Sequence, residues 1–155
     1  DSLQYGHFYL QMLHYIREFS RSMDVMIEAC YEHVENTHFG TTKLQHEELE
    51  KLSANLTNIY TTISTMIKEQ NFEKKEDCKA THEDVLEAIM EFQKNQVRRI
   101  KAGNAHTRNS VLYLSLLGGS KDLIVDAIRL LKVQSKFIVV EEEGIVAVTQ
   151  QSDLS

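Results

Sequence analysis

The sequence predicts an all-α protein, an antiparallel up-down bundle of about four long helices. The chain of 155 residues has no proline and only 6 glycines, so it lacks the turn residues that sheet proteins need roughly every 8 to 12 positions. Its 42% apolar content suits a single globular unit with its own core. Apolar residues also recur at alternating steps of three and four, the spacing that places them on one face of a helix.

The first two predicted helices each carry such a stripe. In the first helix the stripe consists of Met12, Ile16, Phe19, Met23, Met26 and Cys30. Asn36 and Gly40 are expected to end this helix, and Thr41 or Thr42 to cap the next one. The stripe of the second helix consists of Leu49, Leu52, Leu56, Ile59, Ile63 and Met66. Stripes of this kind pack at shallow crossing angles, as in helical bundles.

The third helix is predicted from about Glu73 to Ala102. The fourth is predicted to start near Asn104 to Thr107, either of which can be its N-cap, and to continue to about Phe137. The core face of the third helix is expected to contain Leu86, Met90, Val97 and Ile100. In the fourth helix the segment LIVDAIRLL is apolar nearly all round. This breadth favours a position in the middle of the bundle, and a second interface is the alternative.

Two features interrupt the fourth helical pattern. Gly118 and Gly119 predict either close helix packing or a local bend. After Phe137 the helical period is lost, and we expect either a small hairpin around Glu143 and Gly144 or an acidic, frayed terminus. The predicted domain organisation is therefore a helical bundle over residues 1–138 and a tail over residues 139–155.

Composition and motifs exclude several classes of function. A formal net charge of -6 disfavours a nucleic-acid partner. Cys30 and Cys78 form no CxxC pair, and no apolar run is long enough to span a membrane. QHEELE lacks the second histidine of a zinc protease, and no nucleophile elbow or phosphate loop is present, so we predict no enzyme. The chain begins at Asp1, already close to a periodic pattern, which indicates a larger parent protein.

Positive charge is concentrated between the third and fourth helices. The cluster consists of Arg98, Arg99, Lys101, His106 and Arg108. Cations at a helix C-terminus complement the macrodipole, and Gly103 is suited to a left-handed stop. The alternative is contact with an anion, either acidic residues of a partner or lipid phosphates, near the free N–H groups that begin the fourth helix.

Two acidic pairs are candidates for a metal site. Asp24 and Glu28 lie one turn apart on the first helix, and Asp122 and Asp126 do so on the fourth. In an up-down bundle these helices are antiparallel neighbours, which places both pairs at similar heights. Converging carboxylates suit a hard divalent metal or iron. Two solvated faces are the ordinary alternative.

Two stretches carry a resemblance to a known family. One is FYLQMLHYIREFSRSMDVMIEACYEHVENTH, and the more distinctive one joins RRIKAGNAHTRNSVLYL to KDLIVDAIRLLKVQ. Over roughly Gln4 to Phe137 the chain resembles the cytosolic, PhoU-like C-terminal domain of Bacteroidetes inorganic phosphate transporters. The resemblance implies a soluble regulatory domain of a sodium-dependent transporter, on the cytoplasmic side of the inner membrane, with the transmembrane part as its partner.

The resemblance also bears on the acidic pairs. PhoU-like proteins bind metal clusters through (E/D)xxxD motifs, which Asp122 to Asp126 match in full, whereas Asp24 to Glu28 ends in glutamate. From its apolar breadth, the fourth helix is expected to form a homodimer. Two further interpretations stay open: a helical adaptor unrelated to phosphate, and a carboxylate-metal oxidase.

Overall fold

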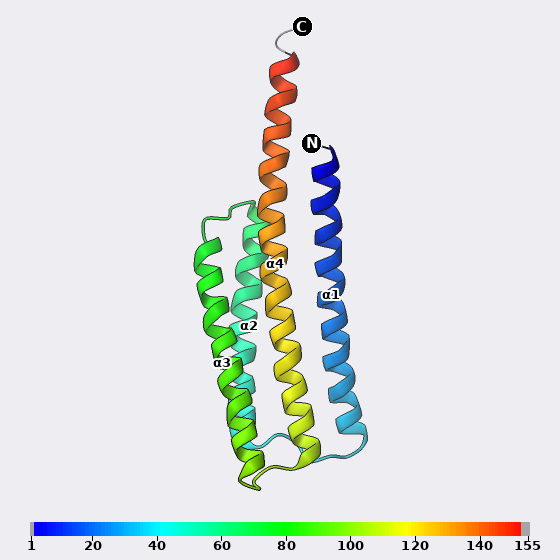
Figure 1. The fold of residues 1–155 in the computed structure, drawn as a ribbon, viewed down its shortest axis with the longest axis vertical. Helices are drawn as coiled ribbons and strands as arrows, with labels where there is room; N and C mark the ends of the chain where they lie inside the picture. The colour runs from blue at the N-terminus through cyan, green and yellow to red at the C-terminus, as the bar shows by residue number, and fades with distance from the viewer. Residues whose placement is uncertain (1, 153–155) are drawn as a thin grey trace.

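The computed structural model describes residues 2–152, with side chains for residues 3–139. This part of the chain forms four helices: α1 (Ser2–Glu35), α2 (Lys43–Glu69), α3 (Lys75–Lys101) and α4 (Thr107–Ser152). Successive helices run in opposite directions, and α1 and α4 extend together past one end of the α2–α3 pair (Figure 1). The predicted all-α, antiparallel bundle is confirmed. No helix in the described part is long and apolar enough to cross a membrane.

The central helix of the bundle is α4, which packs against each of the other three. Its buried face is broad and includes Tyr113, Leu117, Ile124, Ile128 and Leu131, while Lys121, Arg129 and Lys132 on the remaining side are exposed. The breadth of the segment LIVDAIRLL is therefore explained by burial inside the bundle. By contrast, α4 is the only described helix whose backbone lies close to that of α1.

The core lies between α2, α3 and α4. On α2 the predicted stripe is confirmed, since Leu52, Ile59, Ile63 and Met66 are all buried. On α3 the predicted face is wrong except for Leu86, which is partly buried against the core: Met90, Val97 and Ile100 are 44–47% exposed. The residues that α3 buries instead are Cys78, Val85, Ile89 and Gln96. A pattern search limited to apolar residues misses this face because its last member is polar.

Local signals fix the helix ends. Thr42 caps α2 through a reciprocal capping box, in which Gln45 N donates to Thr42 Oγ1 (3.3 Å) and Thr42 N donates to Gln45 Oε1 (2.9 Å). Gly103, just beyond α3, has a φ of 72°, a left-handed conformation that glycine adopts without steric cost. Both expectations from the sequence are confirmed.

The two glycines of α4 do not interrupt the helix. Met26 of α1 lies against Gly119 so closely that a Cβ atom there would overlap the Cγ and Sδ atoms of Met26. Close packing of α1 on α4 is therefore what this glycine permits. The expectation of a hairpin or frayed tail is wrong up to Ser152, because α4 continues as a helix past Gly144. The helix tolerates this glycine because one glycine costs only about 1 kcal/mol in a helix. The rest of the predicted tail, residues 153–155, lies outside the described residues.

Candidate functional site

A buried ion pair joins α2 to α3 near the end of the bundle where α4 begins. Arg99 Nη2 donates to Glu48 Oε1 (2.7 Å), and the two side chains are only 17% and 14% exposed. Tyr113 on α4 donates its hydroxyl hydrogen to Glu48 Oε2, and Asn95 Nδ2 donates to Glu48 Oε1 (3.2 Å). One carboxylate therefore connects three helices.

A chain of neutral hydrogen bonds continues from this ion pair. Gln45 Nε2 donates to Gln96 Oε1 (2.9 Å), which also accepts from Arg99 Nη1 (2.9 Å). Gln96 Nε2 donates to Ser110 Oγ (2.9 Å). Gln45, Gln96 and Ser110 are all at most 4% exposed. Because each bond has a buried partner, this polar network fixes the register of α2, α3 and α4.

The electrostatics of the network favour its charged form. Burial alone would raise the pKa of Glu48, but the hydrogen bonds from Arg99, Tyr113 and Asn95 outweigh burial, so the pKa is lowered. Burial, followed by the hydrogen bond to Glu48, raises the pKa of Tyr113. Tyr113 thus remains a neutral donor to an ionised carboxylate. The arrangement holds charge in place and offers no titrating acid or base near neutral pH.

The five cations predicted as one anion-binding cluster make different contacts. Arg99 belongs to the polar network, while Arg98 Nη1 donates to Glu91 (3.2 Å) and to Asn95 (3.0 Å) on the exposed side of α3. Lys101 is exposed in the last turn of α3. The ring of His106 stacks on Phe39. Arg98 and Arg99 are adjacent in α3, so the helix turns them about 100° apart and only Arg99 reaches the polar network.

The fifth cation, Arg108, lies beside α1. With Glu32, Asn36 and His38 it lines a shallow hollow of about 150 Å³ between the end of α1 and the start of α4. His33 also lines it, and His33 Nε2 donates to the carbonyl oxygen of Phe39 (2.8 Å). This contact holds the α1–α2 loop against the end of α1.

The structure separates the four carboxylates proposed as metal ligands. Asp24, Glu28 and Asp122 are exposed, whereas Asp126 is 8% exposed and accepts from Arg129 Nη1 (3.3 Å). Four helical residues turn through about 400°, so Asp122 and Asp126 diverge by about 40°, and only Asp126 reaches the interior. Among the described residues no group of three or more histidine, cysteine, aspartate or glutamate side chains is placed to hold a metal ion.

An apolar groove lies between α1 and α2 and is floored by α4. It has a volume of about 570 Å³, and its walls include Phe19, Met23 and Met26 from α1 and Leu56 from α2. The ring of Phe19 meets that of Tyr60 across it, with centroids 5.3 Å apart. The Tyr60 hydroxyl is buried without a hydrogen-bond partner among the described atoms. Burial and the nearby Asp126 charge raise the pKa of this phenol.

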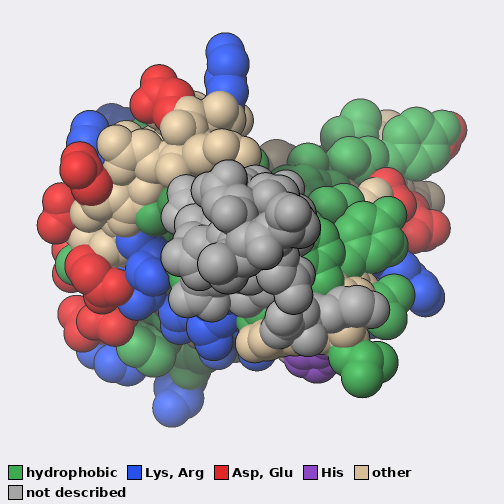
Figure 2. Space-filling model, turned by 90° about the horizontal axis from the view of Figure 1, so that it is seen from above, with side chains coloured by type: hydrophobic (Ala, Val, Ile, Leu, Met, Phe, Trp, Pro, Cys, Tyr) green, Lys and Arg blue, Asp and Glu red, His purple; other side chains and the backbone are tan. Residues whose placement is uncertain are grey.

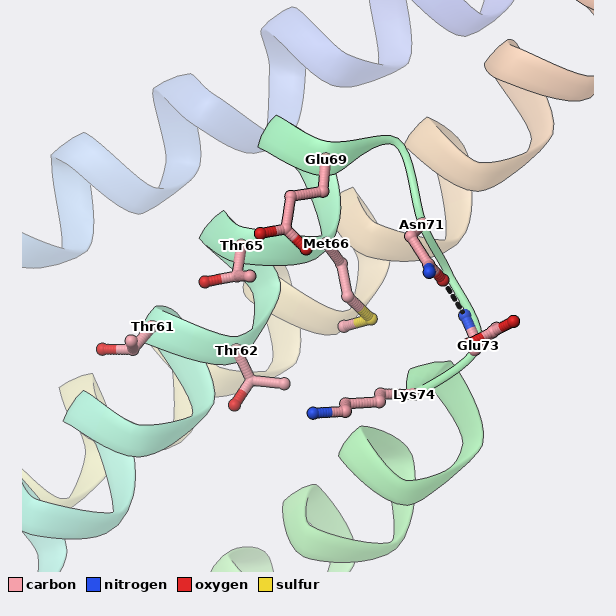
Figure 3. Close-up of a pocket in the computed structure, with 8 residues that line it drawn as sticks. All are labelled: Thr61, Thr62, Thr65, Met66, Glu69, Asn71, Glu73 and Lys74. Carbon is pink, nitrogen blue, oxygen red and sulfur yellow. Dashed lines mark hydrogen bonds between the residues drawn. The ribbon is translucent and has the colours of Figure 1, made fainter.

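A smaller hollow of about 200 Å³ lies at the turn between α2 and α3 (Figure 3). Threonine hydroxyls from α2 and the side chain of Lys74 border it, and Asn71 accepts a hydrogen bond from Glu73 N (3.0 Å) at its edge. Glu69 and Glu73 oppose the charge of Lys74 there. The mixed charge gives this hollow no preference for an anion or a cation.

Two apolar surfaces remain outside the core. One is the α3 patch, formed by Met90, Val97 and Ile100. The other lies on α1, where His33 is the one buried residue among those whose side chains are described. Seen end-on, hydrophobic side chains dominate the side of the molecule that α1 occupies, and charged side chains dominate the opposite side (Figure 2).

Comparison with known proteins adds no identification. No protein-family model, no curated protein and no solved structure matches the chain.

Proposed function

We propose that this bundle is a regulatory domain of a sodium-dependent inorganic phosphate transporter and that it acts through protein contacts with the transmembrane part. The resemblance over Gln4 to Phe137 supports this proposal. Its most distinctive stretch supplies Arg99, Ser110 and Tyr113, which belong to the polar network that orders three helix ends. The domain would stand on the cytoplasmic side of the inner membrane.

The observation that carries a role in protein contacts is the α3 patch. Met90, Val97 and Ile100 follow the helical period, yet they are 44–47% exposed. Lys94 and Lys101 border them on α3 and are also exposed. An apolar surface with a polar, charged rim is the usual composition of a protein contact. Metal binding is not part of the proposal, because no group of three or more histidine, cysteine, aspartate or glutamate side chains in the described part of the chain is placed to hold a metal ion.

The proposal predicts that a charge in the α3 patch uncouples the domain from transport. In cells that express the complete protein, we expect Val97→Asp to change the sodium-dependent uptake of labelled phosphate at least twofold at equal protein level. The same variant of the isolated domain should bind the transmembrane part at least tenfold more weakly. An aspartate buried in an apolar contact without a partner loses its solvation, which is the physical reason.

Val25→Asp is the matched control, because Val25 is an exposed valine of α1 (58%), away from the α3 patch. This variant should leave uptake and binding unchanged. Phosphate uptake that does not depend on sodium, or equal uptake by wild type and Val97→Asp, would contradict the proposal. Binding of the α3 patch to a protein unrelated to transport would instead favour the helical adaptor.

A further inference from the structure

α1 carries a second apolar stripe that no described helix covers. The residues of this α1 stripe follow one another at steps of three and four, with Ser20 filling one gap: Tyr9, Leu13, Ile16, Met23, Ile27, Tyr31 and Val34. Each is between 37% and 75% exposed. At about 100° per residue, the stripe lies roughly 110° round the helix from the side that faces α4. Such a heptad-like seam is the pattern that packs against another helix.

We propose that the α1 stripe is a homodimer interface, in which α1 pairs antiparallel with α1 of a second copy. The stripe is nearly symmetric about the point midway between Ser20 and Met23, with Leu13 and Tyr31 one residue out of register. Antiparallel pairing about this point sets Tyr9 opposite Val34 of the second copy and Ile16 opposite Ile27 of the second copy. Self-complementarity of this kind is what a two-fold interface requires.

The exposed area of the α1 stripe is large enough for a stable dimer. With side chains of the usual size, the exposed fractions amount to roughly 700 Å² on each copy, close to the about 800 Å² that each partner contributes to a standard interface. The stripe extends over residues 9–34, which is about 37 Å of helix at about 1.5 Å per residue. A second α1 covers this length from end to end.

Charge on one flank of the α1 stripe selects the antiparallel orientation. Arg17 and Asp24 lie one heptad apart on the same flank, and both are exposed. In an antiparallel pair the same flanks face each other, so Arg17 of each copy lies beside Asp24 of the other. In a parallel pair this flank would instead face the other flank of the second copy's stripe, which carries Phe19 and Met26. Arg17 and Asp24 would then have no charged partner across the interface.

This inference is independent of the proposed function. Its two-fold axis is perpendicular to α1, so two copies attached to one membrane would lie with α1 along the membrane plane. A failed transport experiment leaves the dimer testable in solution, and a monomeric chain leaves the role of the α3 patch untouched.

The first test compares one isoleucine and one valine of α1 that are equally exposed. Ile27 lies in the α1 stripe and Val25 lies outside it, and both are 58% exposed. By light scattering at micromolar concentration, we expect a dimer mass for wild type and Val25→Asp and a monomer mass for Ile27→Asp, with unchanged helical circular dichroism. A monomer mass for the wild type at all concentrations up to about 100 μM would overturn the proposal, as would equal disruption by both variants.

The second test fixes the orientation by cross-linking in a Cys30→Ser background. We expect Tyr9→Cys and Val34→Cys chains to form a disulfide when mixed, while neither forms one alone. A disulfide within the Tyr9→Cys sample would indicate a parallel pair and overturn the proposed arrangement. The charge pair provides a further check, since Asp24→Arg should raise the dimer Kd about tenfold and Arg17→Asp should restore it in the double variant.

Discussion

The helices α2–α4 and the helix α1 are similar in sequence pattern but differ in how they are held. α2, α3 and α4 together bury residues such as Ile59, Ile89 and Leu131 to 1% exposure or less. On α1 no residue of the stripe predicted from the sequence is fully buried, and Ile16 is 52% exposed. The difference teaches that a 3–4 period identifies a face that packs, without saying how much of that face its own chain covers.

The two regions also differ in their polar contacts. α2–α4 share the polar network around Glu48, in which several bonds are buried. Three contacts of α1 with these helices are apolar: Tyr5 meets Phe137 (4.4 Å between ring centroids), Phe19 meets Tyr60 (5.3 Å), and Met26 packs against Gly119. The apolar groove lies between α1 and α2. We infer that α2–α4 supply most of the free energy of unfolding and that α1 depends on α4 and on a partner.

The largest effect should come from the core of α2–α4. Ile89→Ala removes a side chain with no exposed surface, and we expect it to lower the free energy of unfolding by about 3 kcal/mol because a cavity remains. Val25→Ala on α1 should change it by less than about 0.5 kcal/mol. Urea unfolding followed by circular dichroism measures both values. Equal losses would break the distinction between the two regions.

A smaller loss is expected from the polar network. Glu48→Gln leaves the guanidinium of Arg99 without its ionic partner in a largely buried place, and we expect a loss of about 2 kcal/mol in urea unfolding. Glu47→Gln is the matched control, since Glu47 is an exposed neighbour whose ion pair with Lys43 is 3.9 Å long. A loss in the control as large as that in Glu48→Gln would show that the network adds nothing specific.

The same variant also predicts a pH dependence. The pKa of Glu48 is lowered in the folded state, so its contribution to stability is fully present above its unfolded pKa of about 4.3 and is lost as the pH falls through the lower folded value. The difference in unfolding free energy between wild type and Glu48→Gln should therefore shrink below about pH 4.3. A difference that is constant from pH 7 to pH 3 would exclude an ionised Glu48 in the folded state.

Most of the fold could be predicted from local patterns. The absence of proline, the α2 stripe and the Thr42 cap are all short-range signals, and each led to the right element. The central place of α4 followed from the breadth of its apolar surface. The buried face of α3 could not be found this way, because Gln96 becomes suitable for burial only when Gln45, Arg99 and Ser110 satisfy its amide.

The candidate sites were harder to predict, because each depends on which way a side chain turns. In the sequence Arg99 is one of several neighbouring cations. Its partner Glu48 is 51 positions away, so no local pattern indicates the pair. The acidic pairs have the right spacing on each helix, yet only Asp126 is buried, where it accepts from Arg129, and Asp122 is exposed. One signal was available and overlooked: Thr42 and Gln45 match a capping box, which locates the first glutamine of the polar network.

The smallest effect concerns the seam between α1 and α4 and can be tested at two adjacent glycines. A Cβ atom at Gly118 would meet nothing within 4 Å, whereas at Gly119 it would overlap Met26. We expect Gly118→Ala to raise the free energy of unfolding by about 0.5 kcal/mol, because alanine favours the helix. Gly119→Ala brings the same gain in helix propensity but pushes the Met26 side chain away from α4, so it should be about 1 kcal/mol less stable than Gly118→Ala. Urea unfolding of the two variants measures the difference. The double variant Met26→Ala/Gly119→Ala is the control, because it removes the overlap. If both single variants were equally stabilised, α1 would not be packed closely on α4 at this point.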